Sequence, residues 1–394
     1  MRDAQDTFDS GYYDAGACDL NDFAALVLQD PDSIAVPHAA QVEKRIPLYD
    51  MATLGAILDS QESRRGLMAE WAQVLGAGAG VFVLKAAYQD TSVIDAATRL
   101  YQEVIEREKA TSGGGADHFA AAGSNDRIWN ALQKLCEADA DTYVRYFANP
   151  AIDAACEAWL GPNYQMTAQI NLVRPGGAAQ QAHRDYHLGF QTADTSAEYP
   201  AHVHDLSPLM TLQGGIVHGD TPIESGPTKL LPYSQLYRPG YAAWRRDDFR
   251  EFFDLHSVQL PLDKGDALFF NPALFHAAGA NTSADTQRMV NLLQISSAFG
   301  RAMESVDRTK MCALIFDAMT RLLDDGTLSE PAIDAVIAAT AEGYPFPTNL
   351  DSDPPQNGLA PKSQAALMKE ALSARWSLET FEDALAKQNG RRKA

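Results

Sequence analysis

The pattern of apolar and polar positions divides the chain into a helical part, a strand-rich part and a second helical part. Between about residues 46 and 160, apolar residues recur at three- and four-residue spacing, as in "VIDAATRLYQEVIEREKA", which is typical of amphipathic helices. The run "VFVLKAA" at 81–87 predicts a short buried strand. Residues 127–161 predict two helices, broken at Asn149-Pro150 because proline disfavours a helical residue before it.

The texture of the sequence changes at Gly161-Pro162. From there to about residue 300, short alternating segments lie between turn residues, a spacing that is typical of a β-sandwich or barrel. The segments that predict strands are "YQMTAQINLVRP", "LMTLQGGIVH", "TKLLP", "DALFF" and "RMVNLLQISSA". Helical periodicity returns after residue 301, and one last helix is expected over "SQAALMKEALSARWSLETFEDALAKQ".

These patterns predict one body with three parts rather than two independent domains. Residues 1–45 form an acidic N-terminal lead-in, since the first 32 residues hold eight Asp and a single basic residue, Arg2. Such a segment is typical of a solvated arm. Residues 46–300 combine supporting helices with a β core at about 161–300, and residues 301–394 form a C-terminal helical extension.

Composition narrows the classes of partner. A formal net charge of −20 opposes non-specific binding to nucleic acid or to anionic membranes. No apolar stretch reaches the ~18 residues of a membrane span, and the first residues lack the pattern of a secretory leader. The four cysteines are widely spaced without a CxxC pair, which indicates reduced thiols. We therefore expect a cytoplasmic protein that binds neither nucleic acid nor membranes.

The segment "QAHRDYHLGF" at 181–190 carries the first candidate chemistry, with His183, Asp185 and His187 at alternating positions. On an extended strand all three side chains share one face. However, the first and last of them would lie roughly 13 Å apart, too far for one ion with bonds of about 2.0–2.2 Å. We therefore expect His183 and Asp185 to bind one metal, together with a third ligand from elsewhere in the chain.

The candidate for that third ligand is His276, which follows the apolar run "ALFF" and a turn at Asn271-Pro272. Two histidines and one carboxylate form the facial triad of non-haem Fe(II) oxygenases. Twelve residues later Arg288 opens another apolar strand, and a guanidinium there suits two-pronged recognition of a carboxylate.

A second cluster, "AHVHDL" at 201–206, offers His202, His204 and Asp205 as a rival metal site. No downstream partner in a similar context pairs with it. We expect this cluster to be a loop at the mouth of the active site.

Four features together resemble the phytanoyl-CoA dioxygenase family of Fe(II)/2-oxoglutarate-dependent oxygenases, over about residues 160 to 300. They are "HRD" at 183–185, "ESGPTKLLPYSQ" at 224–235, "GDALFFNPALFHAAGANTS" at 265–283, and Arg288. The middle segment departs from the family pattern, because Tyr233 stands where a small residue is expected and Gln235 replaces a histidine. The resemblance implies a double-stranded β-helix, a jelly-roll barrel, flanked here by N- and C-terminal helices.

The resemblance also implies roles for individual residues. His183, Asp185 and His276 would bind Fe(II), and Arg288 would anchor the C5 carboxylate of the cosubstrate 2-oxoglutarate. With O₂ as the other cosubstrate, such enzymes typically hydroxylate a small molecule and release succinate and CO₂. The aspartate favours hydroxylation over halogenation, because related halogenases have a small residue there. Two further residues on one strand face, Gln169 and Asn171, would contact the cosubstrate or the substrate.

Several alternatives stay open at this point. His187, His204 and Arg174 are candidates for substrate contact, and each is also compatible with a structural role. The runner-up function is a cupin-like metal protein, an isomerase, hydrolase or binding protein, that does not use 2-oxoglutarate. The C-terminal helices would either cover the active site or form the interface of a homodimer.

Overall fold

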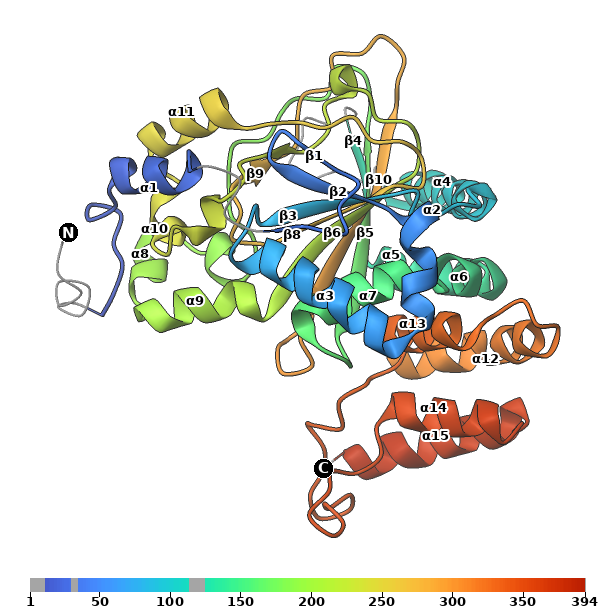
Figure 1. Cartoon of the computed structure of the whole chain (residues 1–394). Helices are drawn as coiled ribbons and strands as arrows, with labels where there is room; N and C mark the ends of the chain where they lie inside the picture. Colours follow the sequence, from blue (N-terminus) through green and yellow to red (C-terminus); the bar gives the residue numbers. More distant parts are fainter. Residues whose placement is uncertain (1–10, 30–34, 113–124, 394) are drawn as a thin grey trace.

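The computed structural model describes residues 11–29, 35–112 and 125–393. A mixed eight-stranded sheet runs through its centre, with the order β1-β2-β3-β8-β6-β10-β5-β4 (Figure 1). The pair β2 and β3 is parallel and the other neighbouring strands of this sheet are antiparallel. The strands are β1 (Gln41–Glu43), β2 (Ile46–Asp50), β3 (Val81–Lys85), β8 (Ala267–Phe270), β6 (Thr211–Val217), β10 (Arg288–Ser296), β5 (Gln165–Val173) and β4 (Asn125–Ile128). A second sheet pairs β7 (Lys229–Leu230) with β9 (His276–Ala277).

The five strands predicted between residues 161 and 300 are present as β5, β6, β7, β8 and β10, and the run at 81–87 is β3. The sheet nevertheless begins well before residue 161, because β1, β2, β3 and β4 all join it. The expected helical start at residue 127 is wrong, since "NDRI" at 125–128 pairs with β5 as an edge strand. Neighbouring side chains of a strand point to opposite faces of the sheet. Asp126 accordingly accepts from Lys109 on one face, and Arg127 donates to Gln169 on the other.

Helices cover one face of the large sheet. Among them, α3, α5, α7 and α13 contact its strands directly (Figure 1). The α-helices are α1 (Leu20–Val27), α2 (Met51–Leu54), α3 (Gln61–Gly76), α4 (Ser92–Ser112), α5 (Ala131–Ala138), α6 (Ala140–Phe147), α7 (Pro150–Leu160), α8 (Ala193–Ala197), α9 (Ala201–Leu209), α10 (Gly240–Ala243), α11 (Asp247–His256), α12 (Arg308–Asp324), α13 (Glu330–Thr340), α14 (Gln364–Ser373) and α15 (Leu378–Arg392).

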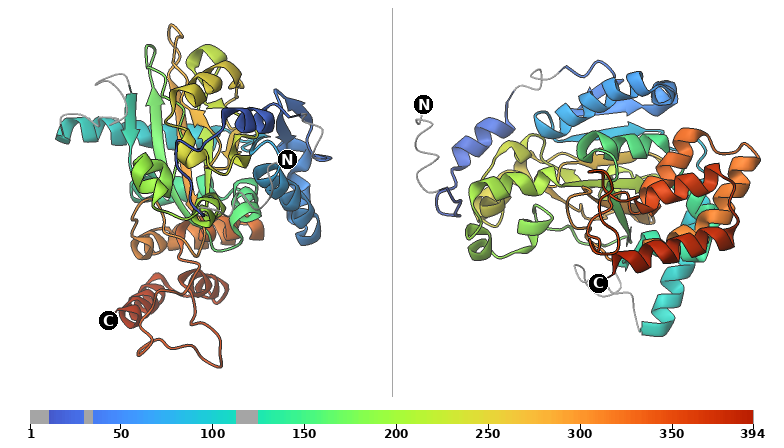
Figure 2. Two further views of the ribbon diagram at one scale, coloured as in Figure 1. Left: turned by 90° about the vertical axis from the view of Figure 1, so that its left-hand side faces the viewer. Right: turned by 90° about the horizontal axis from the view of Figure 1, so that it is seen from below.

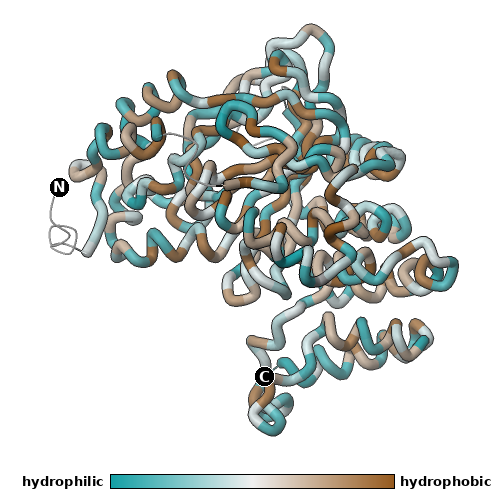
Figure 3. Tube along the Cα trace, in the orientation of Figure 1, coloured by the Kyte–Doolittle hydropathy of each residue, from teal (hydrophilic) through white to brown (hydrophobic). Residues whose placement is uncertain are grey.

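The helix-covered face of the sheet is mostly apolar at its centre, although the buried Asn291 of β10 also lies on it and donates to the Tyr146 hydroxyl. Trp71 of α3 stacks on Phe82 of β3 with ring centroids 5.3 Å apart, and Leu293 and Ile170 on the central strands are completely buried. Figure 3 shows hydrophobic stretches both along the central strands and on the helices around them.

The opposite face, called the open face below, carries more polar side chains, such as Gln169 and Gln213, and Val290 and Leu292 on it are only partly buried. Its polar residues make it the candidate face for a site.

The chain breaks where the sequence predicts at Asn149-Pro150. The Asn149 side chain accepts hydrogen bonds from the backbone N–H groups of Ala151 and Ile152 and so caps α7, while Pro150 occupies its first turn. The region holds three helices after β4 rather than two, because Asp139 ends α5 in extended backbone and caps α6 through the N–H of Thr142.

The last predicted helix is in fact a hairpin of two helices. The chain turns at Arg375, which adopts a positive φ of 53°, and Ser377 then caps α15 by accepting from the backbone N–H of Thr380. The hairpin of α14 and α15 packs on α12, where Phe316 and Phe381 stack with centroids 4.3 Å apart (Figure 2). The sequence-based prediction missed this break because serine and arginine are both tolerated inside helices and so give no stop signal.

Part of the acidic lead-in is packed against the body rather than solvated. Asp19 caps α1, and Phe23 of that helix is fully buried against Phe249 and Phe275. None of the helices within the described residues is both long and apolar enough to cross a membrane.

A buried histidine links the sheet to the helices. His218, at the end of β6, lies between the hydroxyls of Thr98 (2.8 Å from Nδ1) and Tyr146 (2.7 Å from Nε2). The Thr98 hydroxyl donates to the Ile94 carbonyl, so it accepts from Nδ1–H of His218. Nε2 then accepts from Tyr146. This network fits a neutral imidazole, and burial lowers the pKa of His218 to about 3.

We expect this histidine to make the protein acid-sensitive. In the unfolded chain a histidine titrates near pH 6.5. Below that pH the histidine is protonated in the unfolded state but still neutral in the folded state. The free energy of unfolding therefore decreases as the pH falls from about 6.5 towards 3. By pH 5 the loss is about 2 kcal/mol.

Urea unfolding at pH 7 and pH 5 measures this effect. In His218→Gln, which keeps hydrogen-bonding groups but cannot titrate, the loss of stability between the two pH values should be smaller by that amount. Equal pH dependence in the two proteins would show that His218 accepts a proton in the folded state.

Candidate metal centre

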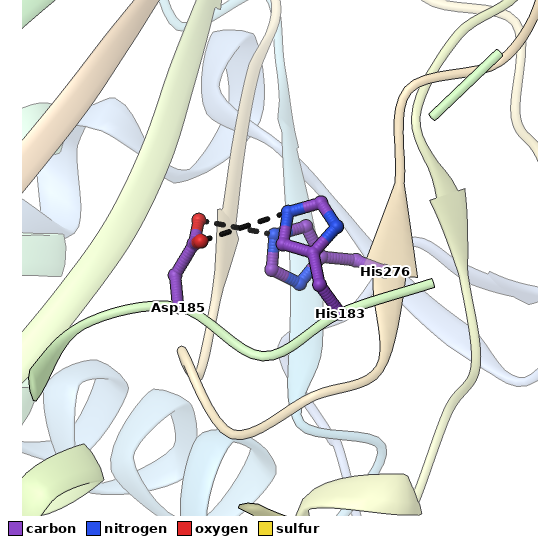
Figure 4. Close-up of side chains that lie close together, drawn as sticks. All are labelled: His183, Asp185 and His276. Carbon is purple, nitrogen blue, oxygen red and sulfur yellow. Dashed lines mark ion pairs between the residues drawn. The ribbon is translucent and has the colours of Figure 1, made fainter. Parts of the chain in front are cut away.

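Three predicted ligands lie together at the edge of the open sheet face. His183, Asp185 and His276 offer one ligand atom each, and these atoms all lie within 4.8 Å of one another. Asp185 Oδ1 is 3.6 Å from His183 Nε2, and Asp185 Oδ2 is 3.4 Å from His276 Nε2. Figure 4 shows both imidazole rings turned towards the carboxylate from the same side. The structure therefore brings together residues that are 91 positions apart in the chain.

The two imidazoles are held in the same tautomer. Nδ1 of His183 lies 2.8 Å from the carbonyl of Gln181, and Nδ1 of His276 lies 2.9 Å from the carbonyl of Leu274. A carbonyl only accepts, so each Nδ1 carries the proton and each Nε2 presents a lone pair to the Asp185 side. Metal-bound histidines are oriented in this way by their second nitrogen.

The third ligand is held as a carboxylate. Burial alone would raise the pKa of Asp185, but His183, His276 and a hydrogen bond from Gln213 together keep that pKa well below its usual range. Gln213 Nε2, on β6, donates to Asp185 Oδ2 over 2.5 Å. Burial also lowers the pKa of His183, against the opposing effect of Asp185. Both shifts favour the protonation states that a cation needs.

The backbone explains why His183 and Asp185 converge while His187 does not. His183 forms an isolated antiparallel bridge with His276, which places the two rings with centroids 4.4 Å apart. The chain then leaves the extended conformation at Tyr186 and His187, which have positive φ values of 62° and 22°. This turn carries His187 to the exposed surface, where its Nδ1 pairs with Ser207 Oγ at 2.9 Å.

Arg288 is buried on the open face of the sheet. Its Nη1 donates to the carbonyls of Ser225 (3.2 Å) and Gly279 (3.4 Å). Burial lowers the pKa of Arg288 to about 10, and no carboxylate in the part of the chain that the structure describes acts on that pKa. At neutral pH this is a buried cation without a counter-charge, which is costly unless an anion binds there.

Gln169 and Asn171 share that face of the sheet. In the antiparallel register Gln169 pairs with Leu292 and Asn171 with Val290. Val290 and Leu292 lie two and four residues after Arg288 along β10, so all these side chains point to the same face. The amide oxygen of Gln169 accepts from Arg127 Nη1 at 3.0 Å, whereas the amide oxygen of Asn171 is buried and has no hydrogen-bond partner.

Two other candidates lie elsewhere. Arg174 forms an ion pair with Asp126, which lies on the helix-covered face, and so does not point towards the triad. The segment 201–206 is not a loop, because it forms the first turns of α9. His204 is buried within that packing, with Nε2 3.0 Å from the carbonyl of Ser196 and its ring edge-on to Tyr13. Helical spacing separates it from His202, which is exposed.

Sequence reasoning missed Gln213, which contacts the triad aspartate. The available signal was a polar residue in the otherwise apolar strand segment "LMTLQGGIVH". Arg184 and Tyr186, the residues that alternate with the ligands, are both buried. The Arg184 guanidinium donates to the carbonyls of Ser234 and Tyr237 at 2.7 and 2.8 Å and so ties the ligand-bearing segment to the neighbouring turn.

The residues present fit Fe(II). Two imidazole nitrogens and one carboxylate oxygen on one side of an ion are the donor set of mononuclear non-haem iron, and they leave its remaining positions open. No cysteine belongs to the cluster, which argues against a structural thiolate site. Arg288 lies on the same sheet as a buried cation, and no described carboxylate acts on its pKa.

Comparisons with known proteins agree with this chemistry. Dioxygenase andF from Emericella variicolor is 26% identical to the chain over 147 residues. The matched region is 36% of this chain and 45% of that protein, so the chain spans less than half of its relative.

Likeness to solved structures is weaker. The non-heme alpha ketoglutarate dependent carbocyclase SnoK from nogalamycin biosynthesis aligns with 58% of this chain and 83% of its own, at 22% identity and a TM-score of 0.43. HygX from Streptomyces hygroscopicus, solved with nickel and 2-oxoglutarate, aligns with 60% of this chain and 90% of its own, at 11% identity and a TM-score of 0.40. Such low scores assign neither a fold nor a ligand.

A family model gives the firmest result. The model of phytanoyl-CoA dioxygenase (PhyH) matches residues 77–290, more than half of the chain. The matched region contains His183, Asp185, His276 and Arg288. The chain belongs to the phytanoyl-CoA dioxygenase family.

Proposed function

We propose that the protein is an Fe(II)- and 2-oxoglutarate-dependent oxygenase that hydroxylates a small molecule and releases succinate and CO₂. One observation carries the proposal beyond family membership. Arg288 is a buried guanidinium without a carboxylate partner among the described residues, on the same sheet as Gln213, which contacts the triad. A metal protein without an anionic cosubstrate gains nothing from such a group, so the cupin-like alternative is disfavoured.

The residues divide the work between them. His183, Asp185 and His276 would hold iron from one side, and Gln213 fixes the orientation of the carboxylate. The Arg288 fork would take the far carboxylate of 2-oxoglutarate. When bound, iron with this cosubstrate supplies the oxidising chemistry. The chain contributes orientation and limits access of water, as where Phe270 packs on His276 with centroids 4.7 Å apart.

We further infer that the two sheets are the walls of a double-stranded β-helix. The pair β7 and β9 forms a sheet of its own, separate from the large sheet, and His276 belongs to β9. Bridges from His183 to His276 and from Leu230 to Val258 widen this small sheet. The triad would then lie where the two walls come together.

An anaerobic visible spectrum tests the proposed function. Fe(II) and then 2-oxoglutarate are added to the metal-free protein, and a weak metal-to-ligand charge-transfer band is expected on the second addition. Succinate, which lacks the keto group, is the matched control and should give no band. If iron binds but 2-oxoglutarate gives no band either, the proposal is refuted and the cupin-like alternative takes its place.

A further inference from the structure

The open face of the sheet has an apolar floor next to the predicted cosubstrate anchor. Val290 and Leu292 point to the same face of β10 as Arg288 and are only partly buried. Met289 and Leu293 point to the opposite face and are buried. Two residues along a strand place these two side chains about 6.6 Å apart. That is roughly the width of one six-membered ring with its substituents.

A polar margin borders this floor on the side of β5 and β4. Register places Asn171 beside Val290 and, on its other side, beside Arg127. Arg127 donates to the amide oxygen of Gln169, which fixes the orientation of that amide. The amide oxygen of Asn171 is shielded from solvent and has no hydrogen-bond partner.

A carboxylate completes the margin. Glu304, in the segment between β10 and α12, accepts from the backbone N–H of Asn130 at 2.8 Å through Oε1, and its carboxyl group lies against the Gln169 amide. Its Oε2 is shielded from solvent, and the carboxyl group also lies near the backbone N–H of Ala168, a donor that favours its ionised form. Burial raises the pKa of Glu304. A shielded acceptor without a donor destabilises the free protein, so the amide oxygen of Asn171, on a margin that also holds a carboxylate, indicates that a bound molecule supplies a donor.

We propose that the substrate is a ring-sized molecule that rests its carbon skeleton on Val290 and Leu292 and presents a hydroxyl or a protonated amine to Asn171 and Glu304. This inference rests on the proposed function, since it names the substrate class of the same site. A substrate with an anionic group at that end is disfavoured, because the group would meet the Glu304 carboxylate.

Binding of three matched probes to the full-length chain tests the proposal. Cyclohexylamine, cyclohexanol and cyclohexanecarboxylate share one ring and differ in a single group, and ligand-observed NMR measures the affinity of each. We expect the amine and the alcohol to bind in the millimolar range that suits such small ligands. The carboxylate should bind at least about tenfold more weakly.

Substitutions at Glu304 separate the two donors. Glu304→Leu should weaken both the amine and the alcohol about tenfold. Glu304→Gln keeps an acceptor but loses the charge, so it should weaken the amine about as much and the alcohol less than about threefold. Glu304→Gln is close in shape to the native side chain, so it gives a result even if the leucine variant does not fold. The matched control is Glu379→Gln on α15, an exposed carboxylate, which should leave all affinities unchanged.

Three results would overturn the inference. They are a carboxylate probe that binds as tightly as the others, Glu304 variants that keep wild-type affinities within about twofold, and the absence of binding by all three probes. None of these measurements uses iron or 2-oxoglutarate. A missing charge-transfer band would therefore refute the proposed function without being confused with any of them.

Discussion

Replacing His276 with alanine should abolish iron binding and all turnover while the metal-free fold persists. Loss of a hydrogen-bond partner behind a metal ligand costs about 10–100-fold in metal affinity. Since His276 would itself be one of three ligands, we expect a loss of more than about 100-fold. The Nδ1 of His276 lies 2.9 Å from the carbonyl of Leu274, and its Nε2 faces Asp185 at 3.4 Å rather than the apolar core. Anaerobic Fe(II) titration gives the affinity, and thermal unfolding of the metal-free variant checks the fold.

The matched control is His202→Ala. His202 belongs to the rival cluster at 201–206 but lies exposed on α9. It should bind iron like the wild type. If the His276 variant retained full iron content, or if the His202 variant lost it, the metal centre would not lie where the triad geometry places it.

The triad could be predicted from the sequence because its signals are local. His183 and Asp185 are two residues apart, so their side chains can share one face of a strand and bind the same ion, whereas His187 is too far along. The third ligand, His276, follows an apolar strand and a turn that bring it back to the sheet. The same reasoning misjudged the 201–206 cluster, whose alternating histidines suit a strand as well as a loop. Pro200 precedes the segment in extended backbone and a helix follows. In a helix, side chains two residues apart point in different directions, so His202 and His204 do not share one face.

Partners that act across the fold could not be predicted. Gln213 and Glu304 belong to no motif. The strand register brings Gln213 to Asp185, and the segment after β10 brings Glu304 to Gln169. Short edge strands were also missed. In β4 the adjacent charged residues Asp126 and Arg127 are typical of the exposed side of a helix. In the sheet, Asp126 instead pairs with Lys109 on one face and Arg127 with Gln169 on the other. Such long-range pairing overrides local propensity.

Arg288→Gln should raise the 2-oxoglutarate concentration needed for half-saturation on the order of 100-fold and leave iron affinity nearly unchanged. The variant removes a buried cation that no described carboxylate balances, so the free protein should be at least as stable as the wild type. Arg288→Lys keeps the charge but loses the planar fork, so its defect should be intermediate. Arg301→Gln is the control, because Arg301 is an exposed arginine.

The cosubstrate itself supplies the decisive comparison. 2-Oxopentanoate keeps the keto acid that chelates iron but lacks the far carboxylate. The wild type should prefer 2-oxoglutarate by about 100-fold, and in Arg288→Gln that preference should fall to a few-fold, because the two partners of one ion pair are non-additive when both are removed. Affinities come from titration of the anaerobic charge-transfer band. A preference that survived in the variant would mean that another residue holds the far carboxylate, and Arg288 would then be a structural cation that the fold tolerates at a cost.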